Sequence, residues 1–152
     1  DEGAAHHGQE DASRLMFVTT SRDPSSKARR FARALASFLS LPYVNRGKQS
    51  PGEDETWLVV VEDHGNPAGI VKRSSEKMEQ LSFRLSGDSE AGRLKRSAAK
   101  VAGEGVIALP IAQFFELEWI GETAPAQGRI IKAASGNIDF MDEGQAKFRL
   151  KI

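Results

Sequence analysis

The segment 15–48 constrains the fold of this chain more than any other stretch. It opens on the short apolar run 15–18, which predicts a buried strand. Apolar residues then recur at helical spacing from Ala28 to Leu39, so a helix here would have one apolar face. The segment therefore predicts a strand followed by an amphipathic helix, as in an α/β fold.

The limits of this helix are marked by residues that start and stop helices. Asp23-Pro24 offers an N-cap acceptor followed by proline at the first helical position, so we expect the helix to begin there. Leu41-Pro42 should end it, because the residue before a proline is pushed out of helical geometry. Residues 43–45 then predict a second strand, and residues 46–48 a basic turn.

Positive charge is concentrated in this unit, although the whole chain has a formal net charge of 0. Residues 14–48 hold eight bases and one acid, Asp23, which makes the segment +7. Such segregation can attract a polyanion over a distance. Arginines that only solvate the outside of an amphipathic helix would give the same run, and spacing alone does not separate these explanations. The cations are Arg14, Arg22, Lys27, Arg29, Arg30, Arg33, Arg46 and Lys48.

The same residues resemble the opening of the Brix domain, a family of ribosome-biogenesis proteins. TTSRDPSSKARRFARAL at 19–35 has the family's threonine-serine-arginine-x-proline-serine run and arginine-rich helix, and YVNRGK at 43–48 follows in the family's order. His64-Gly65-Asn66-Pro67 resembles a later family turn, and KFRLKI at 147–152 resembles the closing strand. One departure is Pro51-Gly52, which forbids the helix that the family usually places after the arginine-glycine-lysine turn.

The resemblance implies a non-catalytic protein that binds ribosomal RNA or its precursor during pre-rRNA processing and subunit assembly. It also implies a short archaeal-type chain of two similar halves, with a mixed, mostly antiparallel sheet and two principal helices, similar to the anticodon-binding domains of some aminoacyl-tRNA synthetases. Ribosome-assembly proteins are further expected partners. We expect a monomer without a cofactor, in the cytoplasm or, in a eukaryote, the nucleolus. The expected RNA-binding residues are Thr20, Ser21, Arg22, Lys27, Arg29, Arg30, Arg33, Asn45, Arg46 and Lys48.

The residues at the start of the helix could contribute to such a site. Thr20 and Ser21 should lie at the mouth of the helix, where their hydroxyls can donate hydrogen bonds to a phosphate. The free N–H groups and the dipole of a helix start also favour an anion, although the charge of Asp23 opposes it. Tyr43, beside the basic turn, is the one aromatic residue placed to stack on a base.

The rest of the chain predicts one domain in two halves. We expect a disordered acidic tail at 1–13 and a Brix-like domain at 14–152, with a first half to about 85 and a second from about 86. A second basic helix is predicted at 90–102, with Gly103 as its C-cap. Strands are predicted at 57–61, 68–72, 81–85, 106–109, 114–120, 129–132, 138–141 and 146–152.

Two surfaces leave a second function open. The middle of the chain, 49–92, has nine acids and four bases, a net charge of −5, and should face away from a polyanion. In the alternative function this acidic region, or an apolar sheet edge, binds proteins and makes the chain an interaction scaffold in a ribosome-assembly complex. The last strand is equally ambiguous, because Lys147, Arg149 and Lys151 on one face suit an RNA surface or a charged edge strand that resists aggregation.

The sequence shows no recognisable motif for catalysis or metal binding. Without cysteine there is no disulfide and no thiolate ligand, and His6-His7 lies in the expected tail, where metal ligands would lack support. His64 is interpreted as a turn residue. Gly47-Lys48 lacks the first glycine and the following helix of a phosphate loop. No run approaches the ~18 apolar residues of a membrane span, so we do not expect a membrane protein. Because no catalytic motif is recognisable, we do not expect an enzyme.

Overall fold

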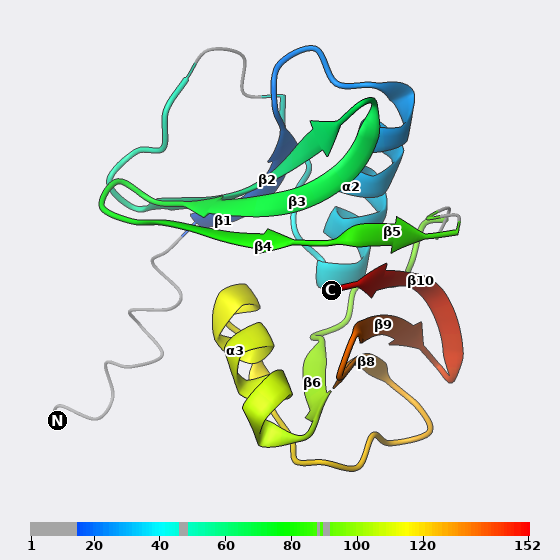
Figure 1. Ribbon diagram of the computed structural model, residues 1–152. Helices are drawn as coiled ribbons and strands as arrows, with labels where there is room; N and C mark the ends of the chain where they lie inside the picture. Colours follow the sequence, from blue (N-terminus) through cyan, green and yellow to red (C-terminus); the bar gives the residue numbers. More distant parts are fainter. Residues whose placement is uncertain (1–14, 46–48, 88, 90–91) are drawn as a thin grey trace, which may run out of the picture.

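The computed structural model describes residues 15–45, 49–87, 89 and 92–152. The expected tail at 1–13 and the basic residues Arg14, Arg46 and Lys48 lie outside these ranges. Within the described part, the chain forms two helices and two mixed β-sheets (Figure 1). The expected α/β class with two principal helices is confirmed.

The first sheet has four strands in the order β1-β2-β3-β4. Strands β1 and β2 are parallel, and the helix α2 provides the connection between them, whereas β2, β3 and β4 are antiparallel neighbours. Residues 56–60 of β2 are buried, as the continuous β-branched run predicts for a strand covered on both faces. The elements are β1 (Leu15–Thr20), α2 (Ser26–Leu39), β2 (Glu55–Asp63), β3 (Asn66–Arg73) and β4 (Met78–Ser82).

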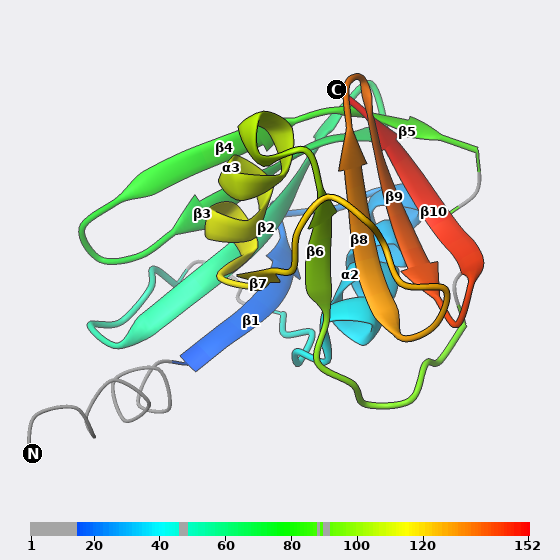
Figure 2. The same cartoon turned by 90° about the horizontal axis from the view of Figure 1, so that it is seen from below.

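The second sheet has six strands in the order β5-β10-β9-β8-β6-β7. Strand β5 follows β4 after the single residue Phe83, so one extended segment runs from the first sheet into the second (Figure 1). Figure 2 shows the strands β6, β8, β9 and β10 side by side. The elements are β5 (Arg84–Ser86), β6 (Lys100–Gly103), α3 (Gly105–Phe115), β7 (Glu118–Trp119), β8 (Arg129–Ala134), β9 (Asn137–Asp142) and β10 (Gln145–Lys151).

Helix α2 holds the two sheets together. Its apolar face contacts β1, β2 and β3 of the first sheet. Phe31 also packs on Phe83 and Phe148, with ring centroids 5.3 and 5.6 Å apart, and Phe38 packs edge-on against Phe140 at 5.1 Å. Both α2 rings are fully buried, so one helix carries core contacts of both sheets and can expose only its remaining face.

The start of α2 differs from the expectation. Asp23 does not cap the helix; it has a positive φ of 52°, and Ser25 is the N-cap, whose hydroxyl accepts a hydrogen bond from the Ala28 N–H at 3.1 Å. The end of β2 and the turn after it hold Ser25 in place. The Glu62 carboxylate accepts a hydrogen bond from the Ser25 N–H, and the Gly65 carbonyl accepts one from the Ser25 hydroxyl. The predicted end is nearly right, since Ser40 closes the helix in the left-handed conformation.

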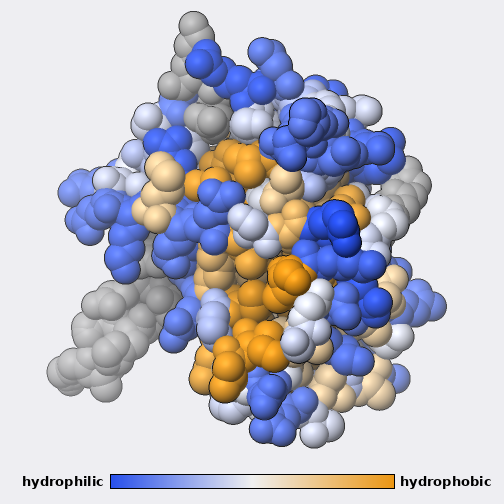
Figure 3. Space-filling view, in the orientation of Figure 1, coloured by the Kyte–Doolittle hydropathy of each residue, from blue (hydrophilic) through white to orange (hydrophobic). Residues whose placement is uncertain are grey.

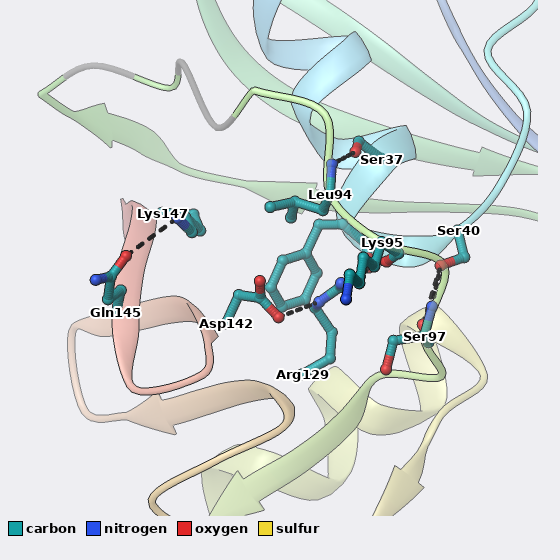
Figure 4. Close-up of polar contacts among 10 residues, drawn as sticks. Ser37, Ser40, Leu94, Lys95, Ser97, Arg129, Asp142, Gln145 and Lys147 are labelled. Atoms are coloured by element: carbon teal, nitrogen blue, oxygen red, sulfur yellow. Dashed lines mark hydrogen bonds and ion pairs between the residues drawn. The ribbon is translucent and has the colours of Figure 1, made fainter.

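The second helix was predicted at the wrong place. Of the predicted helix at 90–102, residues 90–91 lie outside the described ranges, residues 92–99 belong to no helix or strand, and 100–103 form β6. Backbone groups of residues 92–99 have partners in α2: the N–H groups of Leu94 and Ser97 donate to the hydroxyls of Ser37 and Ser40 at 3.0 and 2.9 Å (Figure 4). Because these distant side chains satisfy the backbone, the basic segment does not need helical hydrogen bonds.

The actual second helix, α3, occupies the apolar run that predicted a strand at 106–109. Ala108, Ile111, Ala112 and Phe115 are buried at helical spacing, and Pro110 lies inside the helix. A short run that is apolar on all sides does not distinguish a buried strand from a buried helix. The predicted strand at 114–120 consequently shrinks to β7, because its first residues belong to α3.

Three smaller predictions also change. The predicted strand at 43–45 is reduced to a single parallel bridge between Tyr43 and Val18, and the predicted strand at 81–85 is divided between β4 and β5. Strand β10 pairs with both β5 and β9, so it is not an edge strand of the second sheet. Because β5 pairs only with residues 149–151 of β10, the charged-edge explanation is wrong for Arg149 and Lys151 and stays a prediction for Lys147.

Candidate nucleic-acid interface

The exposed face of α2 carries cations because the apolar stripe uses the opposite face. Lys27, Arg29, Arg30 and Arg33 are exposed, whereas the intervening Ala28, Phe31 and Ala32 are buried. Figure 3 shows hydrophilic side chains covering the region of α2. The structure thus places four of the predicted RNA-binding residues on one helix, and Arg22 is exposed in the turn before it.

Few of these cations are neutralised within the described part of the chain. Arg22 and Arg29 form no ion pair with a described carboxylate, and the Lys27 ammonium donates to the amide oxygen of Asn66 at 3.3 Å. The Arg33 guanidinium lies over the ring of Tyr43, 5.4 Å from its centroid. Tyr43 is half-buried and covered by Arg33, so its ring is not an open platform for stacking on a base.

Thr20 and Ser21 lie at the end of β1, before the start of the helix, and they differ from the exposed cations of α2 in burial. Thr20 is buried at the end of β1, and the Ser21 N–H donates to the Val60 carbonyl at 3.0 Å. The helix begins several residues later, and Glu62 already supplies a carboxylate to the N-cap Ser25 at 3.0 Å. Asn45 is exposed, and its neighbours Arg46 and Lys48 lie outside the described residues.

Two hollows flank α2 and share Arg30. The first, of about 330 Å³, is lined by Lys27, Arg30 and Arg84 together with uncharged residues. The second, of about 420 Å³, is lined by Arg29, Arg30 and Arg33. No described residue that lines either hollow is acidic. Arg84 was missed by the sequence prediction: its alternation with Leu85 indicated an outward side chain, but only the packing of β5 beside α2 brings it to this surface.

The cations of β10 are not equivalent. Arg149 donates two hydrogen bonds to the carboxylate of Asp139, and this bonding together with the carboxylate's charge raises the Arg149 pKa. Its charge is therefore largely balanced within the sheet. Lys151 lies directly opposite Arg84 in the β5–β10 ladder, so two like charges project from one face there.

Acidic residues gather at the other end of the first sheet. A hollow of about 550 Å³ is lined by six acids and two lysines from the segment before β2, the hairpin between β3 and β4, and the end of α3. Of these, Lys72 and Glu116 form an ion pair at 3.0 Å. The hairpin lies at the left of Figure 1 and α2 at the right, so charges of opposite sign are separated across the molecule. The acids are Glu53, Asp54, Glu55, Glu76, Glu79 and Glu116.

An apolar surface lies on α3. Val106 and Leu109 are 83% and 40% exposed, and Trp119 of the adjacent β7 is 37% exposed. Figure 3 shows apolar side chains gathered in this region.

Other kinds of site find little support in the described part of the chain. It contains no group of three or more His, Asp or Glu residues that could hold a metal ion. His64 lies in the turn between β2 and β3 with a positive φ of 52° and an exposed side chain, which confirms it as a turn residue. No described helix is both long enough and apolar enough to cross a membrane.

Comparison with known proteins finds relatives in archaea. The chain is 29% identical over 151 residues to a probable Brix domain-containing ribosomal biogenesis protein of Methanosarcina mazei, covering 90% of this chain and 96% of the relative. A protein of the same name from Archaeoglobus fulgidus is 43% identical over 77 residues, covering 47% of this chain and 50% of the relative. No protein-family model matches the chain.

Solved structures agree with these sequence matches. The crystal structure of an archaeal Imp4-like protein superposes with a TM-score of 0.71 and 26% identity, covering 90% of this chain and 96% of that one. A probable ribosomal biogenesis protein from Aeropyrum pernix shares the fold with a TM-score of 0.60 at 20% identity, covering 91% of this chain and 94% of that one. In sequence and in fold, the chain is similar to archaeal proteins named as Brix domain-containing or Imp4-like ribosome biogenesis proteins.

Proposed function

We propose that this protein binds ribosomal RNA during ribosome biogenesis, without catalysing a reaction. The observation that carries the proposal is the row of exposed cations on α2, flanked by two hollows whose described lining contains no acid. The names of the archaeal relatives support ribosome biogenesis as the setting. The residues themselves support only a polyanionic ligand.

Structured RNA suits this surface for a physical reason. An RNA duplex displays phosphates and 2′-hydroxyls across a wide, shallow minor groove, and proteins grip it largely by shape and charge. Arginine can contact a phosphate with two parallel hydrogen bonds, which fixes orientation as well as charge. On α2, Arg30 and Arg33 are three residues apart and therefore neighbours on the helix surface, where both are exposed and can present such donors.

The test is RNA binding measured across salt concentrations. If about six cations each neutralise one phosphate, the logarithm of the affinity should fall with the logarithm of the salt concentration with a slope of roughly −4 to −5. Filter binding with ribosomal RNA fragments and with an unrelated RNA of equal length would measure the slope and any preference for ribosomal RNA. A slope near zero would contradict the proposal.

A second function, as a protein-interaction scaffold within an assembly complex, is favoured by two observations. The acidic hollow could attract a basic protein segment, and the exposed apolar residues Val106, Leu109 and Trp119 form a surface of the kind that proteins bury on association. The two functions differ in a simple way. Substitutions on α2 should weaken RNA binding in the first case and leave assembly unaffected in the second.

A further inference from the structure

The smaller hollow beside α2 is built where the two sheets join. Its cations come from two elements: α2 supplies Lys27 and Arg30, and β5 supplies Arg84. Residues of β3 and of the segment after β5 complete the wall, and none of the described ones is acidic. A volume of about 330 Å³ leaves space for a phosphate group and several waters, since a water's share of liquid volume is ~30 Å³. The uncharged lining residues are Asn66, Pro67, Leu85, Gly87 and Ser89.

Two contacts place the backbone beside Arg84 and the side chain of Lys27 at this hollow. The N–H of the buried Phe83 donates to the Ala68 carbonyl at 3.0 Å, which holds the neighbouring Arg84 beside the start of β3. On the other side, the Lys27 ammonium is 3.3 Å from the amide oxygen of Asn66. The positions of these cations therefore follow from how the helix and both sheets pack, and a shift of one side chain would not abolish the hollow.

Arg84 also has an unfavourable neighbour. It lies directly opposite Lys151 in the antiparallel ladder of β5 and β10. Residues directly opposite each other in an antiparallel ladder project from the same face of the sheet, and like charges at such positions destabilise the pairing of the two strands. An anion bound beside Arg84 would offset this repulsion, whereas an apolar or cationic ligand would not.

We propose that this hollow binds a backbone phosphate of RNA through Lys27, Arg30 and Arg84, which extends the RNA site from α2 to the second sheet. The inference rests on the proposed function. A polynucleotide fits better than a free phosphate, because the larger hollow shares Arg30 and Ser89 with this one and continues along the helix to Arg33. Lys27 and Arg33 are ~9 Å apart along the helix axis, so neighbouring phosphates of one strand can contact both hollows.

The experiment compares Arg84→Gln with the control Lys77→Gln. Both replace an exposed cation by an uncharged side chain, but Lys77 lines the acidic hollow at the other end of the molecule. With a ribosomal RNA fragment as the probe, Arg84→Gln should lower the affinity about threefold to tenfold near 0.1 M salt and flatten the salt slope by roughly 0.9. Lys77→Gln should change neither quantity.

A double-mutant cycle tests whether the cations share one phosphate. Lys27→Gln and Arg84→Gln should be non-additive in RNA affinity, because groups that act on one ligand atom are coupled. Additive losses would show two separate contacts and would overturn the shared site. Arg84→Lys should recover most of the affinity, and thermal unfolding of each variant separates a lost contact from a lost fold.

The possible failures are distinguishable. If the parent protein does not bind RNA, the proposed function is wrong. If the parent binds with a steep salt dependence and Arg84→Gln binds equally well, only the hollow is wrong and the RNA surface is confined to α2.

Discussion

At the scale of single residues, burial separates two roles of arginine. Arg129 on β8 is 3% exposed, and its guanidinium donates to the Asp142 carboxylate at 2.8 Å, to the Phe38 carbonyl at 2.8 Å and to the Lys95 carbonyl at 2.6 Å. Figure 4 shows Arg129 reaching Asp142 beside the segment that carries Lys95. This residue ties α2, the segment 93–99 and two strands together, whereas Arg29 and Arg30 face solvent.

Removing the buried arginine should damage the fold. Arg129→Met leaves the Asp142 carboxylate and two backbone carbonyls without their donor, so we expect the free energy of unfolding to fall by about 3–5 kcal/mol. Arg149→Met is the matched control, because Arg149 pairs with Asp139 on the same strand β9 but at an exposed position, so its removal should cost far less stability. Urea denaturation of both variants measures the difference, and equal losses would contradict the assignment.

At the scale of elements, α2 combines two faces with different tasks. Its apolar face joins the two sheets through Phe31 and Phe38, and its charged face lines the two hollows. Arg30 and Phe31 are neighbours in sequence but ~100° apart around the helix. A single helix therefore allows stability and RNA binding to be perturbed independently.

The two faces of α2 should give opposite results. Phe31→Ala removes a fully buried ring and should lower the free energy of unfolding by about 3–5 kcal/mol, a large share of the ~5–15 kcal/mol of a typical domain. Arg30→Glu should cost under about 1 kcal/mol of stability but weaken RNA binding severalfold, because an anion replaces a cation. Thermal unfolding and RNA titration of the two variants provide the check. If Arg30→Glu unfolds the protein, the charged face is structural.

At the scale of the whole molecule, charge is divided between two ends. The cations of α2 and Arg84 lie at one side, and the acidic hollow formed by the start of β2, the β3–β4 hairpin and the end of α3 lies at the other. A polyanion approaching this protein would be repelled from one end and attracted to the other. Under the proposed function, this arrangement would orient the ligand even though the formal net charge is 0.

Neutralising the acidic end should leave RNA affinity within about threefold of the parent, because those acids face away from the RNA. Glu53→Gln, Asp54→Asn and Glu76→Gln form a suitable triple variant; Glu55 is spared because it accepts hydrogen bonds from the Trp57 indole and the Gly52 N–H. The matched triple variant on α2 should flatten the salt slope by roughly 2.7. A large loss of affinity in the acidic variant would count against the orientation proposed. The α2 variant combines Lys27→Gln, Arg29→Gln and Arg33→Gln.

Local patterns in the sequence determined a large part of this structure. The apolar spacing from Ala28 to Leu39 predicted α2, and the β-branched run at 57–61 predicted β2. Both patterns are formed by residues that are close in sequence, so the buried face of each element can be predicted locally. The alternation at 146–152 predicted β10. The exposed cations of α2 followed from the same periodicity, since residues off the apolar face of a helix must face solvent.

Only the tertiary structure decided the remainder. The segment 93–99 is not helical, and its hydrogen-bond partners lie far away in the chain, as with Leu94 and Ser37, which are 57 positions apart. The apolar run of α3 became a helix through its packing on β6 and β8. Arg84 joined the cations of α2 because β5 crosses from one sheet to the other beside that helix. Such contacts depend on chain topology, and no local spacing of residues reports them.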